Sequence, residues 1–406
     1  MLRSRMMRWR HVHMGTFKVT GEFCRNFLPS FPRGLVSLCL IISGNSEIVF
    51  SAGFMSTLFA TLHRCCSDLR SLTLNGKGVI CWDNFCATWS DLSALGLADV
   101  TCSWLVPNGL PDLSRWDSLP GCIHSLYLGD CFLRFPDLLS ARKWDNLEQL
   151  TIRRLPCTDF GFPPEDIQHA IFPRLQRLEI QGLDDRVTAW DRVASGGALR
   201  ALHLETDYEL RNLACLRSVA SRNPCLTQVF LVLRNVDRHH LSVDTLLSLA
   251  SIASLRKLSL GCLDWDGCAG DQTLIQHNQL ISPVEELQLL LDLKAYPDLF
   301  FADLLSKTFP DLKRLHLNLY DLEPPAQNTP VPARLRLENL ESFEVSCIRE
   351  DYLQGLNLSL STGNALKQFI VCRNPHKFIK TQVSPGGSDY ADSFCNLPDV
   401  ESLHLD

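Results

Sequence analysis

Two cysteines and three aspartates crowd the stretch LRKLSLGCLDWDGCAGD, behind an alternating apolar run. Carboxylates and thiolates at close spacing are the ligand types of calcium and zinc sites, so this stretch is the strongest metal candidate in the chain. Asp264 and two further aspartates fall within eight residues, and DWDG matches the start of a calcium-binding loop. Such a loop needs glycine sixth and glutamate twelfth, whereas here Gly267 is fourth and Ile275 is twelfth. The spacing excludes a calcium loop and predicts a polar turn that leaves a strand.

Other catalytic patterns fail on spacing as well. The segment NGKG at 75–78 lacks the further glycine and the Lys-Ser/Thr ending of a phosphate-binding loop, and the chain has neither G-x-S-x-G nor H-E-x-x-H. His239 and His240 are adjacent, so they would not share one face of a helix. Without a nucleophile–base pair or a set of metal ligands, we expect a protein that is not an enzyme and that needs no cofactor or metal.

Composition indicates a globular chain without the charge of a nucleic-acid binder. The 406 residues are 46% hydrophobic, and 39 basic residues against 45 acidic ones give a formal net charge of −6. A nucleic-acid binder would need a basic excess along one face, so we expect no nucleic-acid partner. The 17 cysteines are odd in number and contain no C-x-x-C, which predicts reduced, mostly buried thiols.

The N-terminal residues bear on the cell compartment. The first ten residues hold four arginines and no apolar core of signal-peptide length. No apolar run in the chain approaches the ~18 residues of a membrane span. We therefore expect no membrane association and a cytoplasmic or nuclear protein. The lack of any acidic residue before Glu22 leaves a mitochondrial presequence as the alternative.

One six-residue frame, apolar at positions 1, 4 and 6, recurs along the whole chain. LRKLSL is one of fourteen copies, whose starts lie 23 to 34 residues apart and about 28 on average. The copies start at residues 35, 69, 92, 123, 147, 175, 199, 226, 255, 284, 312, 340, 366 and 400. Chance apolar runs would not keep that spacing over the whole chain, so the frame marks an internal repeat.

The frame L-x-x-L-x-L at this period resembles the leucine-rich repeat. Two copies are complete through the ninth position, which is Cys131 in IHSLYLGDC and Asn374 in LKQFIVCRN, while other copies depart from Asn or Cys there. The resemblance implies an α/β leucine-rich-repeat solenoid, that is, a horseshoe with a concave parallel β-sheet and convex helices. About 14 irregular repeats would form this domain at residues 35–406.

The residues themselves predict the same succession of elements. Alternation at positions 4 to 6 predicts a short strand with one buried face, and helix-like stretches lie between frames at 54–66, 243–255 and 301–309. Prolines two residues before a frame would end the preceding helix at a fixed place; they are Pro173, Pro224, Pro310 and Pro398. Each repeat would then bury its leucines only against its neighbours.

Positions 3, 5 and 7 of each frame are predicted to point away from the core, onto the concave face. Fourteen strands at ~4.8 Å spacing would make a sheet roughly 60 Å long, and ~15 Å of strand width gives on the order of 900 Å², one side of a standard protein interface. The face mixes charge signs and includes an exposed Phe230, which favours a protein partner over a polyanion. A merely solvated face is the alternative. The predicted contact residues are Arg177, Glu179, His203, Glu205, Phe230, Lys257, Glu286, Arg314, His316 and Glu344.

The segment RWRHVHMGTF resembles the final helix of an F-box, where fungal F-box/leucine-rich-repeat proteins often carry W-R-x-V before their first repeats. Trp9, Arg10 and Val12 match that motif, and the resemblance implies that they bind the F-box adaptor of a cullin ubiquitin ligase. The Leu-Pro entry and leucine-rich helices of a whole F-box do not precede them. Residues 1–34 are therefore expected to be an F-box remnant.

The expected function is protein binding on the concave face, as the substrate-recognition part of an F-box type ubiquitin ligase. A free-standing inhibitor or scaffold of the ribonuclease-inhibitor type, unrelated to ubiquitin, is the alternative. In the stretch with the crowded aspartates, only Lys257 and Ser259 would face the partner.

Overall fold

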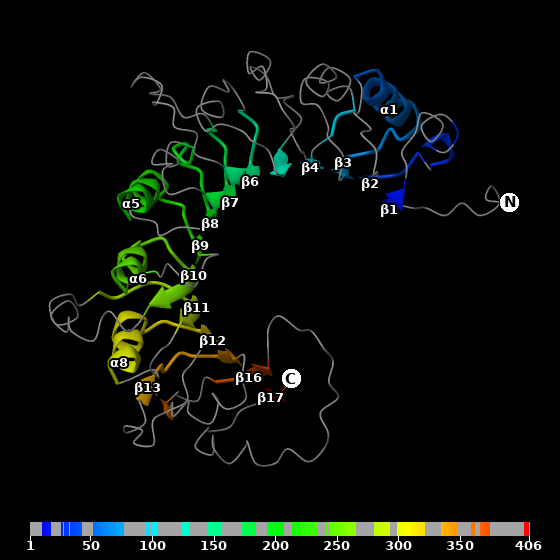
Figure 1. The fold of residues 1–406 in the computed structure, drawn as a ribbon. Coiled ribbons are helices and arrows are strands. Elements are labelled where there is room, and N and C mark those ends of the chain that lie inside the picture. Colours follow the sequence, from blue (N-terminus) through cyan, green and yellow to red (C-terminus); the bar gives the residue numbers. More distant parts are fainter. Residues whose placement is uncertain are drawn as a thin grey trace. The chain divides into compact units, whose positions relative to one another are not determined.

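A computed structural model of the chain describes residues 10–17, 26, 28–31, 33–42, 52–76, 95–97, 99–103, 124–129, 145–155, 172–183, 193–206, 213–233, 241, 243–264, 280–292, 299–320, 334–347, 359–361, 366–373 and 402–405. The chain forms two compact units. The first unit comprises Met1–Leu204 and Ser221–Cys225, and the second comprises Glu205–Ala220 and Leu226–Asp406. Parallel strands dominate both units, and a few helices connect them (Figure 1).

In the first unit the strands follow one another in chain order. They are β1 His11–Phe17, β2 Ser37–Ile42, β3 Ser71–Gly76, β4 Asp99–Ser103, β5 Ser125–Gly129, β6 Gln149–Leu155, β7 Arg177–Leu183 and β8 Ala201–Thr206, the last of which ends beyond the unit boundary. The 3-10 turn η2 Leu28–Ser30 precedes β2, and helix α1 Ala52–Cys65 connects β2 to β3. Neighbouring strands from β1 to β7 pair in parallel.

The second unit repeats the same plan. Its sheet runs in the order β9 Gln228–Leu233, β10 Lys257–Asp264, β11 Glu286–Asp292, β12 Arg314–Tyr320, β14 Ser342–Cys347, β16 Gln368–Arg373 and β17 Ser402–Leu405. Helices α5 Leu213–Arg222, α6 Val243–Ala250 and α8 Leu299–Thr308 each precede a strand. Two short strands, β13 Arg334–Arg336 and β15 Ser359–Ser361, form a separate parallel pair, and β13 lies against α8.

The strands pair so that equal frame positions lie side by side. Lys257 of β10 is opposite Gln228 of β9 and Glu286 of β11, and all three occupy position 3 of their frames. Where each strand begins, the amides of positions 2 and 3 both donate to the position 2 carbonyl of the preceding repeat. Lys313 and Arg314, for example, donate to the Glu285 carbonyl over 2.8 and 3.0 Å. The repeat seen in the sequence is therefore also a repeat of backbone hydrogen bonds.

The apolar frame positions form the core, as the sequence predicts. Leu255 at position 1, and Leu258 and Leu260 at positions 4 and 6, are each at most 1% exposed, and the corresponding leucines of the other described frames are similarly buried. Full burial of one such side chain contributes roughly 1.5–3 kcal/mol. Because positions 3 and 5 lie on the opposite side of the strand, they are left for the outer face of the sheet.

The predicted helices at 54–66, 243–255 and 301–309 are confirmed as α1, α6 and α8, although α6 ends earlier, at Ala250. Helix α5 was not predicted. Prolines mark the turns into the next strand as expected. Pro173 and Pro310 lie in turns closed by bonds from the Leu175 amide to the Phe172 carbonyl and from the Leu312 amide to the Phe309 carbonyl, both 3.2 Å. Pro224 also lies in a turn, and Pro398 falls outside the described residues.

The frame placed at residue 92 is wrong by five residues. In the structure Asp99 of β4 pairs with Ser71 of β3, so Asp99 holds position 3 and the frame is LADVTC, beginning at Leu97. Leu97 is fully buried, and Gly96 just before it has φ +62°, a conformation that does not occur within a strand. The corrected start lies 28 residues after Leu69 and 26 before Ile123, so the correction makes the repeat more regular.

The expected F-box helix near the N-terminus is also wrong, because His11–Phe17 is the strand β1. Val12 pairs with Leu38, which is position 4 of the next frame, and the amides of Val36 and Ser37 donate to the Arg10 carbonyl. WRHVHM is therefore a further copy of the repeat frame, 26 residues ahead of Leu35. Its tryptophan occupies position 1, and Trp9 itself falls outside the described residues.

The chain is thus α/β, with parallel strands and few helices in each unit, which is consistent with a solenoid-like repeat fold. In the part of the chain that the structure describes, no helix is both long enough and apolar enough to span a membrane. Of the cysteines there, Cys66 and Cys215 are buried, Cys39 and Cys65 are half-buried, Cys225 is exposed, and all five are free thiols.

Candidate functional site

The outer face of the sheet carries the residues predicted to bind a partner. In the second unit we define the sheet face as the side chains at positions 3 and 5 of strands β9 to β16. Position 3 supplies Gln228, Lys257, Glu286, Arg314, Ser342 and Gln368, and position 5 supplies Phe230, Ser259, Gln288, His316, Glu344 and Ile370. The in-register pairing of the strands makes each set a continuous row, so that neighbours along the row come from successive repeats.

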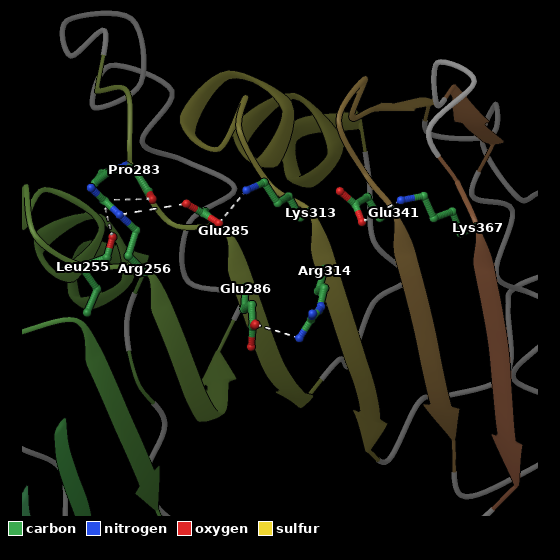
Figure 2. Close-up of polar contacts among 9 residues, drawn as sticks. All are labelled: Leu255, Arg256, Pro283, Glu285, Glu286, Lys313, Arg314, Glu341 and Lys367. Carbon is green, nitrogen blue, oxygen red and sulfur yellow. Dashed lines mark hydrogen bonds and ion pairs between the residues drawn. The ribbon is translucent and has the colours of Figure 1, made fainter. Parts of the chain in front are cut away.

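Charges in the position 3 row are paired across the strands. The Glu286 carboxylate of β11 receives Lys257 Nζ of β10 at 3.0 Å and Arg314 Nη1 of β12 at 2.8 Å (Figure 2 shows the Arg314 contact). Lys257 also lies over the Phe230 ring of β9, 5.7 Å from its centroid, a distance at which cation–π attraction acts. The structure therefore brings four of the predicted contact residues together in one cluster.

A second charged row, at position 2 where the strands begin, was not predicted. Its side chains alternate in sign over five repeats: Arg256, Glu285, Lys313, Glu341 and Lys367. Printed along the strand starts in Figure 2, Glu285 pairs with Arg256 at 4.0 Å and with Lys313 at 2.7 Å, and Glu341 pairs with Lys367 at 3.3 Å. The hydrogen bond from Lys313 lowers the pKa of Glu285, and the same contact raises the pKa of Lys313.

The position 2 row could have been found in the sequence. The second letters of five consecutive frames read R, E, K, E and K. In parallel in-register strands equal positions lie side by side, so opposite charges attract across the sheet and a slipped register would lose that pairing. Each exposed pair contributes only about 0–1 kcal/mol, so we assign the row to holding the register rather than to the site.

The position 5 row contains a polar cluster around His316. Its Nε2 atom lies 3.0 Å from Ser346 Oγ and 3.7 Å from Glu344 Oε1, both on β14. A serine, a histidine and a carboxylate are the parts of a hydrolytic triad, but there the carboxylate orients the ring through the other nitrogen. Here both groups approach the same nitrogen, and the Ser346 side chain is buried. The cluster is therefore a structural hydrogen-bond network.

Burial lowers the pKa of His316, and the nearby Glu344 carboxylate only partly offsets this. The folded state thus binds the proton less readily than the unfolded chain, whose histidine has the ordinary value of 6.5. The stability from this site is complete above pH 6.5 and is lost as the pH falls through that value towards the lower folded-state pKa.

We therefore expect the variant His316→Gln to lose less stability than the parent protein between pH 7 and pH 5, since glutamine keeps a hydrogen-bonding side chain that does not titrate. Urea midpoints measured by circular dichroism at the two pH values would test this. His63→Gln, at an exposed position of α1, is the control. An unchanged acid sensitivity in His316→Gln would contradict the expectation.

In the first unit, the predicted residues Arg177, Glu179 and His203 also meet. Glu179 of β7 lies 3.6 Å from Arg177 Nη2 on the same strand and 3.8 Å from His203 Nδ1 on β8. Gln181 Nε2 donates to Glu179 Oε1 at 2.7 Å. Glu205 follows His203 by two residues on β8 and is half-buried. As in the second unit, the carboxylate is surrounded by donors while the arginine is exposed.

The remaining candidates do not add chemistry. Among the described residues no group of three or more histidine, cysteine, aspartate or glutamate side chains could hold a metal ion. Of the aspartates that crowd the opening stretch, Asp266 and Asp271 fall outside the described residues. Burial, and secondarily the adjacent Cys65, raise the pKa of Cys66 to about 11, so this thiol is a poor nucleophile.

No protein-family model matches the chain, and a search of curated proteins finds no match. The inference of function consequently depends on the geometry above and on the sequence resemblance.

Proposed function

We propose that the chain is a leucine-rich-repeat solenoid, curved as a horseshoe, that binds a protein partner on its concave sheet face and performs no catalysis itself. The observation that carries the proposal is the sheet face of the second unit. Paired charges there surround a half-buried aromatic side chain, Phe230, beside Lys257. Aromatic side chains and cations presented on a rigid surface are the groups that most often dominate protein–protein binding energy.

Rigidity supports the proposal as well. Each strand of the face is fixed to its neighbours by backbone hydrogen bonds and by buried leucines on the other side of the sheet. Side chains held on strands lose little conformational entropy on binding, which favours affinity per unit of area. The mixed charge of the face fits a protein surface better than a uniformly charged polymer.

A photo-crosslinking amino acid at Gln288, an exposed position of β11, tests the face directly. We expect light-dependent adducts with a partner in native cell extract. Phe230→Ala should reduce them about tenfold, because an aromatic anchor typically contributes more than 1 kcal/mol. The same crosslinker at the exposed Lys307 of α8 is the control. Equal adducts from both positions, or no effect of Phe230→Ala, would refute binding on this face.

The more specific proposal is that the protein delivers its partner to a cullin-type ubiquitin ligase through an F-box adaptor. It is supported by the W-R-x-V match at Trp9, Arg10 and Val12 alone, and Val12 belongs to strand β1 rather than to a helix. That strand favours the second candidate, a free-standing inhibitor or scaffold that is a protein binder without a ubiquitin link. Co-expression with the adaptor decides between them: co-purification that Trp9→Ala abolishes supports the ligase, and its absence supports the scaffold.

A further inference from the structure

The cluster on β10 to β12 presents cations to solvent and holds its carboxylate further in. Glu286 lies between Lys257 and Arg314, and both cations reach the same carboxylate. The exposed side-chain fractions are 68% for Arg314 and 40% for Lys257, against 31% for Glu286. The cluster carries two positive charges and one negative charge, so a further anion can be accommodated.

Both cations also keep hydrogen-bonding capacity. A guanidinium has five N–H donors and an ammonium has three. Among the described residues Arg314 makes one contact of this kind, through Nη1 to Glu286, and Lys257 makes one to the same group. The outer edge of the Arg314 guanidinium is therefore open to the paired hydrogen bonds that a carboxylate forms best.

The neighbours of the cluster restrict what kind of anion fits. On one side lies Phe230, in contact with Lys257, with the amide of Gln288 in the same row. On the other side, Glu341 and Glu344 of β14 would repel a long uniform polyanion that continued across the sheet. The site thus fits one or two carboxylates next to an apolar group, a combination that an acidic peptide segment offers.

We propose that the partner docks an acidic peptide segment on β10 to β12, with a carboxylate on the outer edges of Arg314 and Lys257 and an adjacent apolar side chain against Phe230. This inference rests on the proposed function, because it names the class of partner for the same face. Salt screens exposed charges over about 8–10 Å, so binding weakens as ionic strength rises.

The probe is a fluorescein-labelled peptide of alternating glutamate and glycine with a central phenylalanine, titrated with the whole chain and followed by fluorescence anisotropy. Arg314→Gln is expected to weaken its binding about tenfold, and Phe230→Ala by a similar factor. Lys307→Gln removes an equally exposed cation, one that pairs with Asp303 on α8, and should change nothing. Urea midpoints confirm that each variant is folded.

Three outcomes overturn the inference. The first is equal binding by the parent protein and Arg314→Gln. The second is equal binding of a control peptide in which glutamine replaces every glutamate. The third is tighter, equally Arg314-dependent binding of a single-stranded RNA of similar length, which would assign the cluster to polyanions. If the acidic peptide fails while crosslinks from Gln288 persist, only the class of partner is wrong; if both fail, the proposed function fails with it.

Discussion

Alanine in place of Gly196 is expected to destabilise the first unit by about 3 kcal/mol, or to prevent its folding. Gly196 lies in the turn before β8, where a Cβ atom would overlap the Phe172 carbonyl oxygen and lie 3.0 Å from Pro173 Cα. Both neighbours are backbone atoms of the preceding repeat, so no rotation of a side chain relieves the overlap. Relief would require the turns of two repeats to move apart.

Gly34→Ala is the matched control, because nothing lies within 4 Å of a Cβ atom at that position. There we expect no loss, and a gain of up to about 1 kcal/mol from the reduced entropy of the unfolded chain. Urea unfolding followed by circular dichroism gives both values. Equal midpoints for the two alanine variants would show that the turn before β8 yields more easily than its geometry indicates.

The repeat frame could be predicted from the sequence because its physical cause is local and periodic. Alternating leucines specify one buried strand face, and a fixed spacing specifies that equal positions pair; both features hold from Leu35 to Leu405 in the described frames. Proline positions predicted the turns for an equally local reason, since the ring excludes continuation of a helix. These features needed no knowledge of distant contacts.

The two frame errors have different causes. LSALGL and LADVTC overlap and satisfy the same apolar pattern, so the pattern could not choose between them; the left-handed conformation of Gly96 excludes the first. At the N-terminus, tryptophan replaces leucine at position 1, and the W-R-x-V match directed the prediction towards a helix. In both places the regular spacing of 26 to 28 residues would have given the right frame.

The candidate site was predicted residue by residue but not as an arrangement. That Lys257 and Arg314 share Glu286 follows from in-register pairing of position 3 in three repeats, once the frames are aligned. The relative exposure of the cations and the carboxylate does not follow, because it depends on how far each side chain extends from the sheet. The distinction between pairing and display therefore required coordinates.

Asn223→Ala is expected to cost about 2–4 kcal/mol, which is the second large effect. The Asn223 side chain is fully buried, accepts a hydrogen bond from the Leu199 amide at 3.1 Å and donates one to the Ala194 carbonyl at 2.6 Å. Its removal leaves two backbone groups without these partners in a place that water does not reach. The loss of stability is the desolvation cost of those groups, and the free-energy change in urea unfolding measures it.

Asn339→Ala separates this effect from the general loss of an asparagine in a turn. Asn339 also donates to a carbonyl of the preceding repeat, that of Pro310 at 3.1 Å, but the contact is exposed, so water can replace the side chain and we expect a cost below about 1 kcal/mol. Asn223→Asp sharpens the test further. A carboxylate still accepts from the Leu199 amide but cannot donate to the Ala194 carbonyl, so it should destabilise as much as alanine does. If Asn223→Asp is tolerated, the bond to Ala194 contributes little and the Leu199 amide alone explains why an asparagine is buried there.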